Sequence, residues 1–239
     1  WQAYGDSRSM TPHTGNDNPY GNQGPAFDNG FGTGGTEGLL LPPWERRERF
    51  GFLNGLYLTI KDVLLAPRQF FHRMPSEVGL LEPLYFALVL GVFSAFVAWM
   101  WSLAGSSLQM FIDDDIRDIV KGPLVAFSMF VASPFLTALG VVIKAALMHG
   151  VLILISGNRL GFEATFRVAA YGEAAGILTL VPACGGGIGL IWSLVVTVIG
   201  LYSIHETAPW RAVVAVILAT SICASVIGAG VISVALGMG

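Results

Sequence analysis

The sequence predicts an all-α membrane protein with five transmembrane helices, preceded by an amphipathic helix at the membrane interface. Three observations support this fold class. The 239 residues are 54% hydrophobic and only 12% charged, whereas soluble domains carry about 25% charged residues. The mean hydropathy is +0.65. Uncharged apolar runs recur along the chain, and about 20 such residues suffice to cross a bilayer.

Residues 1–43 form a tail rich in Gly, Asn and Pro, without apolar periodicity. Such a segment cannot bury enough apolar surface to fold alone. We expect it to lie against a partner protein, and the alternative is that it packs on its own membrane domain. Aromatic side chains dominate binding at interfaces, so the expected docking residues are Trp1, Tyr4, Tyr20, Phe27 and Phe31.

Residues 44–73 are predicted to form a basic amphipathic helix in the headgroup plane, ended by Pro67. A helix docked on a soluble partner is the alternative. The apolar residues at helical spacing are Leu53, Leu56, Tyr57, Ile60 and Leu64. The basic residues that flank or interrupt the stretch are Arg46, Arg47, Arg49, Lys61, Arg68 and Arg73.

The remaining residues, 74–239, are predicted to hold five membrane spans. The apolar run from Pro123 to Ile155 is too long for one straight span, so we expect Pro134 to divide an interfacial piece from the span. The predicted spans are approximately 83–104, 133–155, 164–181, 188–204 and 212–236.

Five spans place the two termini on opposite sides of the membrane. Lys and Arg are most frequent in the N-terminal flank and recur in the loops on the same side, at Arg159, Arg167 and Arg211. The opposite side carries only Arg117 and Lys121, within an acidic loop. Because basic residues favour the cytoplasmic side, we expect a cytoplasmic N-terminus and an external C-terminus.

Ionisable and polar groups inside the predicted spans are candidates for function, because they are costly in a bilayer. Four stand out: Lys144, His149, Tyr171 and Glu173. Helical rise places Lys144 and Glu173 at similar depths, about 16 and 13 Å from the cytoplasmic end, and likewise His149 and Tyr171, about 9 and 10 Å. A proton or ion relay is one interpretation. An internal salt bridge and a His–Tyr hydrogen bond are the structural alternative.

Arg159 and Arg167 are candidates to hold a lipid phosphate at the mouth of the third span. An i,i+4 ion pair of Glu163 with Arg167 is an equally good interpretation. No metal-ligand spacing, cofactor motif or nucleophile motif is evident in the sequence. The basic residues are too few for nucleic-acid binding. We therefore expect no enzyme activity, no metal, no cofactor, no nucleic acid and no identifiable small-molecule substrate.

Residues in roughly 50–220 resemble the Yip1 domain family in its bacterial form. The pieces that carry the resemblance occur in the family's order and spacing. They are Pro67, Phe70, Phe71, His149, Gly157, Phe162, Thr165, Phe166, Arg167, Tyr171, Pro182, Trp192, Gly200, Leu201, His205, Arg211 and Ala212.

The resemblance implies five helices and a cytosolic N-terminus in the bacterial cytoplasmic membrane. Eukaryotic members are known as trafficking proteins that bind Rab-type GTPases, but their Asp-Leu-Tyr-Gly-Pro motif is absent here, so GTPase binding is not expected. Our first hypothesis is a non-enzymatic accessory or scaffold subunit of a larger membrane assembly, in contact with lipids and other membrane subunits. The alternative is a small transporter or lipid-handling protein that uses the polar groups between spans two and three.

Overall fold

A computed structural model describes residues 40–109 and 116–237, and in these two ranges all regular structure is helical. The tail residues expected to dock a partner, Trp1, Tyr4, Tyr20, Phe27 and Phe31, lie outside them. The elements in chain order are η1 (Pro43–Arg46), α1 (Arg47–Phe50), α2 (Phe52–Leu65), α3 (Pro67–Arg73), α4 (Leu81–Gln109), α5 (Ile116–Leu154), α6 (Gly161–Tyr171), η2 (Gly172–Leu180), α7 (Gly185–Ile204) and α8 (Pro209–Gly237).

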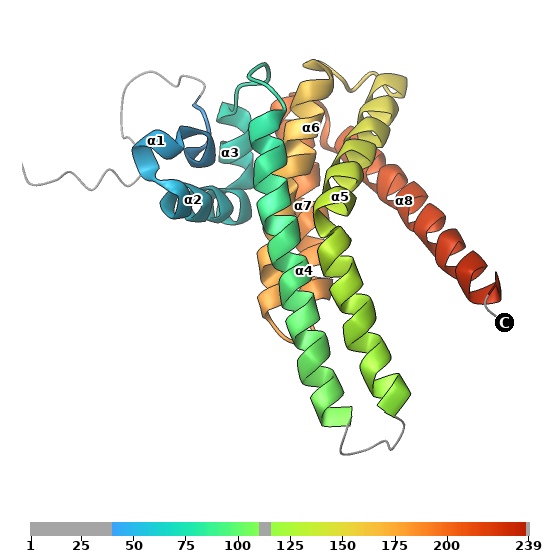
Figure 1. The fold of residues 1–239 in the computed structure, drawn as a ribbon. Coiled ribbons are helices and arrows are strands. Elements are labelled where there is room, and N and C mark those ends of the chain that lie inside the picture. Colours follow the sequence, from blue (N-terminus) through green and yellow to red (C-terminus); the bar gives the residue numbers. More distant parts are fainter. Residues whose placement is uncertain (1–39, 110–115, 238–239) are drawn as a thin grey trace, which may run out of the picture. The chain divides into compact units, whose positions relative to one another are not determined.

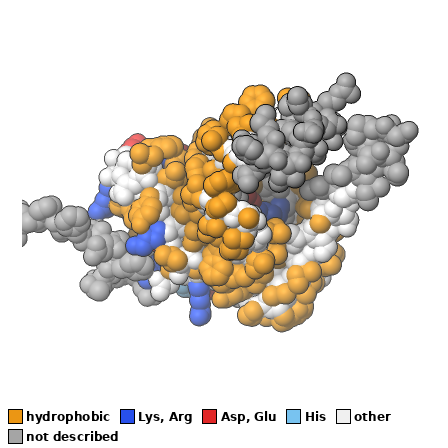
Figure 2. All heavy atoms as spheres, turned by 90° about the horizontal axis from the view of Figure 1, so that it is seen from below, with side chains coloured by type: hydrophobic (Ala, Val, Ile, Leu, Met, Phe, Trp, Pro, Cys, Tyr) orange, Lys and Arg blue, Asp and Glu red, His pale blue; other side chains and the backbone are white. Residues whose placement is uncertain are grey.

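Four of the described helices are long and apolar enough to cross a membrane. Hydrophobic side chains accordingly cover most of the described surface seen in Figure 2, with only a few charged groups among them. The chain is therefore an integral membrane protein. The four segments are Leu81–Gly105, Gly122–Leu154, Gly185–Ile204 and Pro209–Val226.

The predicted third span is not one α-helix. It consists of α6 followed by η2, a nine-residue 3₁₀ helix, which is unusual because such runs rarely exceed three or four residues. Close packing accompanies this change of helix type: a Cβ on Gly176 of η2 would lie 2.4 Å from Ser94 Oγ of α4. Together the two segments run along the bundle, from the junction with α5 to the turn before α7 (Figure 1).

The prediction that Pro134 divides an interfacial piece from the second span is wrong. Helix α5 runs without interruption from Ile116 to Leu154, with both Pro123 and Pro134 inside it. A proline in a helix leaves the carbonyl four residues earlier without its N–H partner. Here that carbonyl is on Phe130, and the Ser133 hydroxyl donates to it at 2.7 Å. This side-chain bond replaces the lost backbone bond.

The stretch 44–73 is not a single interfacial helix but the four short elements η1 to α3. Helix α2 ends at Leu65, just before the Ala66–Pro67 step, as predicted. It lies across the bundle helices rather than along them (Figure 1). The ends of the stretch are part of the core, because Trp44 is 2% exposed and Phe71 is fully buried.

The core is concentrated where α5 joins α6 and α7 joins α8, which we call the loop end of the bundle (residues 74–80, 155–160 and 205–208). All residues of α6 from Ala164 to Tyr171 are buried there. Aromatic rings from two other helices pack on Tyr171: Phe70 lies at 5.3 Å and Phe86 at 5.0 Å between ring centroids. The candidate site lies within this core.

Candidate functional site

A buried polar cluster joins η1 to α6 at the loop end of the bundle. The carboxylate of Glu45 accepts hydrogen bonds from the Arg167 guanidinium and from the Tyr171 hydroxyl, both at its Oε1. The side chains of Arg167 and Glu45 are 0% and 4% exposed. We call these three residues the anchor cluster. One turn of α6 separates Arg167 from Tyr171, so both side chains project from the same face of that helix.

Arg167 also holds the 74–80 loop. Its Nη1 donates to the carbonyl of Gly79 at 3.1 Å, and its Nε is buried without a hydrogen-bond partner among the described residues. The same loop is bonded from the other side, because Glu163 accepts the backbone N–H groups of Val78 at 2.6 Å and Gly79 at 2.5 Å. Thus Glu163 and Arg167 each bind the loop, one through its N–H groups and one through a carbonyl.

Trp44, the neighbour of Glu45, is held by two hydrogen bonds, one from its backbone and one from its side chain. Its backbone N–H donates to Thr59 Oγ1 at 2.9 Å, and its indole Nε1 donates to the carbonyl of Glu82 at 2.9 Å. The Glu82 carboxylate in turn pairs with both terminal nitrogens of Arg47, at 2.5 and 3.0 Å. This hydrogen bond raises the pKa of Arg47 above its ordinary value. Element η1 is therefore bonded to both α2 and α4, and α1 is bonded to α4.

The anchor cluster is suited to holding the N-terminal segment that contains η1. A buried ion pair contributes little net stability. Removing one partner, however, leaves the other charge buried without a counter-charge, and this is strongly destabilising. The chain on the N-terminal side is tied at a second point, where Leu40 N–H donates to the carbonyl of Arg73 at 2.8 Å. Consequently the path by which the N-terminal residues reach the bundle is fixed from Leu40 to Arg47.

The structure pairs Lys144 with Glu173, as depth matching predicted. Lys144 Nζ of α5 lies 2.5 Å from Glu173 Oε1 of η2. Their side chains are 21% and 32% exposed, so both point largely into the helix bundle rather than away from it. An opposite charge at this distance reduces the cost of each charge within a membrane.

The predicted pairing of His149 with Tyr171 is wrong. Tyr171 is occupied by Glu45, while His149 Nδ1 lies 3.3 Å from Thr165 Oγ1. Thr165 Oγ1 is also 2.9 Å from His205 Nε2. A chain of three polar side chains thus links α5, α6 and the end of α7, and two of them, Thr165 and His205, were absent from the predicted site.

The environment of His205 assigns its tautomer. Its Nδ1 accepts from the backbone N–H groups of Arg159 at 3.4 Å and Leu160 at 3.3 Å, which leaves the proton on Nε2 to donate to Thr165. Burial, and secondarily the nearby His149, lower the pKa of His205 to about 4. The neutral imidazole therefore fastens the 155–160 loop to the end of α7.

The lipid-phosphate candidates have different environments. Arg167 is fully buried and paired with Glu45, so a lipid headgroup cannot reach it in this structure, and the prediction is wrong for this residue. The alternative i,i+4 pair with Glu163 does not form either, since each residue has the other partners described above. Arg159 is exposed, and lipid binding there stays a prediction.

Sequence reasoning missed Glu45, Trp44 and Glu82. Trp44 and Glu45 fell in the stretch 44–73 that was predicted to lie in the headgroup plane, and Glu82 lay just outside the first predicted span. One signal was available: two prolines precede Trp44 and Glu45, and a rigid turn next to a large aromatic residue is typical of a fixed, packed segment. It does not identify the partner of Glu45, which is 122 positions away.

Several of the residues that carried the family resemblance lie in the core at the loop end. Phe71, Leu201 and Ala212 are fully buried together with the side chains of α6. Gly200 permits this packing, because a Cβ there would lie 2.6 Å from Val168 Cγ1 and 3.0 Å from the Phe71 ring.

Comparison with known proteins identifies a family. The family model described as Yip1 domain matches residues 61–231. No curated protein and no solved structure matched the chain.

Proposed function

Because the chain belongs to the Yip1 domain family, we propose that it is a non-enzymatic scaffold or accessory subunit of a larger assembly in the membrane. In this proposal the residues before Leu40 and the exposed face of α2 bind neighbouring subunits and lipids. The anchor cluster is the main support for this proposal. It fixes η1 in the bundle core, and η1 lies a few positions after the residues that would bind partners. A partner held by the N-terminal residues is thereby coupled to the membrane domain.

The exposed face of α2 supports a docking role. Leu53 is 75% exposed, Tyr57 62% and Leu65 76%, and together with Lys61 they recur at four-residue spacing along one side of the helix. The opposite side, with Val63 among others, is buried. An apolar stripe with basic neighbours is suited to the headgroup plane of a membrane. We propose that this face contacts lipid.

We further propose five membrane crossings. The α6–η2 segment supports the fifth, because eleven α-helical and nine 3₁₀ residues extend over about 34 Å, comparable to the hydrocarbon core. The distribution of Lys and Arg then favours a cytoplasmic N-terminus and an external C-terminus, in a bacterial cytoplasmic membrane. Labelling of a cysteine added after Gly239 from outside intact cells supports this topology, and labelling only from the cytoplasmic side contradicts it.

Co-purification from native membranes in a gentle detergent tests the scaffold role. We expect a variant lacking residues 1–37 to fold but to lose its partner subunits. A matched full-length variant, with serine at the five aromatic positions named for the tail (Trp1, Tyr4, Tyr20, Phe27 and Phe31), should lose them as well. If both variants retain their partners undiminished, the scaffold proposal fails.

One observation favours the alternative, a small transporter or lipid-handling protein. A cavity of about 90 Å³ lies beside Lys144, in the middle of the membrane helices. Vesicles containing the purified protein test it: movement of protons or labelled lipids that is lost in Lys144→Met but kept in Lys61→Met, an exposed lysine, supports this function. The absence of any such movement leaves the scaffold as the better proposal.

A further inference from the structure

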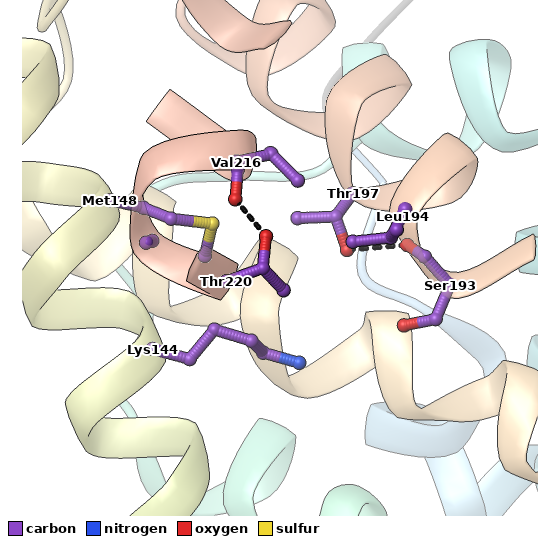
Figure 3. Close-up of a pocket in the computed structure, with 8 residues that line it drawn as sticks. Lys144, Met148, Ser193, Leu194, Thr197, Val216 and Thr220 are labelled. Carbon is purple, nitrogen blue, oxygen red and sulfur yellow. Dashed lines mark hydrogen bonds between the residues drawn. The ribbon is translucent and has the colours of Figure 1, made fainter. Parts of the chain in front are cut away.

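A cavity that polar side chains from three helices share with apolar ones lies between α5, α7 and α8, separate from the anchor cluster. Figure 3 shows Lys144 extending from α5 toward hydroxyl groups on α7 and α8. The cavity measures about 90 Å³. Half of its lining residues are polar, and the full lining is Lys144, Met148, Ser193, Leu194, Thr197, Val216, Ala219 and Thr220.

The three hydroxyl groups of the lining have already used their hydrogens. Ser193 donates to the carbonyl of Gly172 at 3.4 Å, and Thr197 donates to the carbonyl of Ser193 at 2.7 Å. Thr220 donates to the carbonyl of Val216. Each hydroxyl oxygen therefore has only lone pairs left to offer, so it acts as an acceptor toward a bound molecule.

Lys144 supplies the complementary donors. Its ammonium group carries three hydrogens, and among the described residues it has one acceptor, Glu173 Oε1. Two hydrogens remain for another partner. The lining thus combines a positively charged donor with several neutral acceptors, separated by a space too small for a large ligand.

We propose that this cavity is a binding site for a cluster of water molecules that solvates the Lys144–Glu173 ion pair within the membrane. A water molecule accepts from the ammonium group and donates to a hydroxyl oxygen, which satisfies both kinds of group at once. The 90 Å³ cavity exceeds the roughly 10–15 Å³ that a single water needs, so it has room for several waters. An anion matches the ammonium but not the acceptor oxygens, and an acyl chain matches neither.

The proposal explains how charged groups are held in an apolar bundle. A salt bridge in hydrocarbon still leaves hydrogens and lone pairs unsatisfied, and each costs free energy. Water inside the cavity satisfies them and raises the local polarity around the pair. This hydration goes beyond the scaffold function and does not depend on it.

Radiolytic footprinting of the intact protein in lipid nanodiscs tests the proposal without any substitution. Hydroxyl radicals formed from bound water oxidise an adjacent methionine to its sulfoxide. Met148 lines the cavity and is 1% exposed, and Met74 is an equally buried control at 2% exposed in the core of the loop end. We expect Met148 to oxidise several-fold faster than Met74. Equal rates for the two methionines overturn the proposal and indicate a dry or acyl-filled cavity.

A double variant tests which groups hold the water. Thr197→Val with Thr220→Val removes two acceptor oxygens at nearly constant volume and leaves Lys144 and Glu173 in place. We expect the oxidation rate of Met148 to fall to that of Met74, while the rates of Met74 and of exposed Met100 stay the same. An unchanged Met148 rate in this folded variant overturns the assignment. If the double variant does not fold, Thr220→Val alone is measured in the same way.

Discussion

Glu45 and Arg167 form a buried ion pair across 122 positions of the sequence. The pair brings a short N-terminal element into the core that α6 forms with α3, α4 and α7. It is also one of the contacts that tie residues outside the membrane helices to the bundle. The first prediction follows from this relationship.

The Glu45→Gln substitution leaves the buried Arg167 guanidinium without its counter-charge. We expect a loss of stability of roughly 3–5 kcal/mol, the range for breaking one side of a buried pair. Thermal unfolding in detergent measures it. The matched control is Glu48→Gln, since Glu48 is an exposed acid one turn away. Combining Glu45→Gln with Arg167→Met should recover part of the loss, and a double variant no better than the single one contradicts the pairing.

Lys144 and Glu173 should be energetically coupled. We expect Glu173→Gln alone to destabilise more than Glu173→Gln combined with Lys144→Met, with a coupling energy of roughly 0.5–3 kcal/mol. The physical reason is that the single change leaves an unpaired ammonium group inside the bundle. Unfolding midpoints of the wild type, both single variants and the double variant are the four measurements of a double-mutant cycle. Additive losses would show that the two side chains act independently.

Acid should weaken the fold through His205. Its pKa in the folded protein is lowered from 6.5 to about 4, so the unfolded chain binds more protons between these values. Stability is therefore complete above about pH 6.5, declines as the pH falls, and levels off near pH 4. The maximum loss is roughly 3 kcal/mol, from 1.36 kcal/mol per pKa unit.

The His205→Asn variant isolates this effect. The Asn oxygen lies near the position of Nδ1 and keeps the acceptor for the 155–160 loop, but it does not titrate. We expect unfolding midpoints that fall less between pH 6.5 and pH 4 than those of the wild type. His72→Asn, at an exposed histidine, should keep the wild-type profile. A His205→Asn profile as steep as that of the wild type assigns the acid sensitivity to other groups.

Gly200 should not tolerate a side chain. An alanine Cβ would lie 2.6 Å from Val168 Cγ1 and 3.0 Å from Phe71, which forces α3, α6 and α7 apart. We expect Gly200→Ala to cost roughly 1–3 kcal/mol, as overpacking of a core does, measured by thermal unfolding. Gly186→Ala is the control, because nothing lies within 4 Å of that position. Adding Val168→Ala to Gly200→Ala should restore part of the stability, and no recovery argues against this clash.

The sequence by itself predicted four segments that the structure describes as helices long and apolar enough to cross a membrane, because apolar length is a local property that needs no tertiary contact. It also predicted the Lys144–Glu173 pair, since helical rise fixes depth and a buried charge needs an opposite charge nearby. The family resemblance was likewise available from the order of residues, and a Yip1 domain match over 61–231 supports it.

Only the tertiary structure decided which polar groups meet where several elements converge. Depth alone matched His149 with Tyr171. In the structure, the rotation around each helix axis and the position of η1 instead pair Tyr171 with Glu45 and His149 with Thr165. These outcomes rest on contacts between distant positions, whose geometry is set by how all the helices pack together and not by the pattern of any one segment.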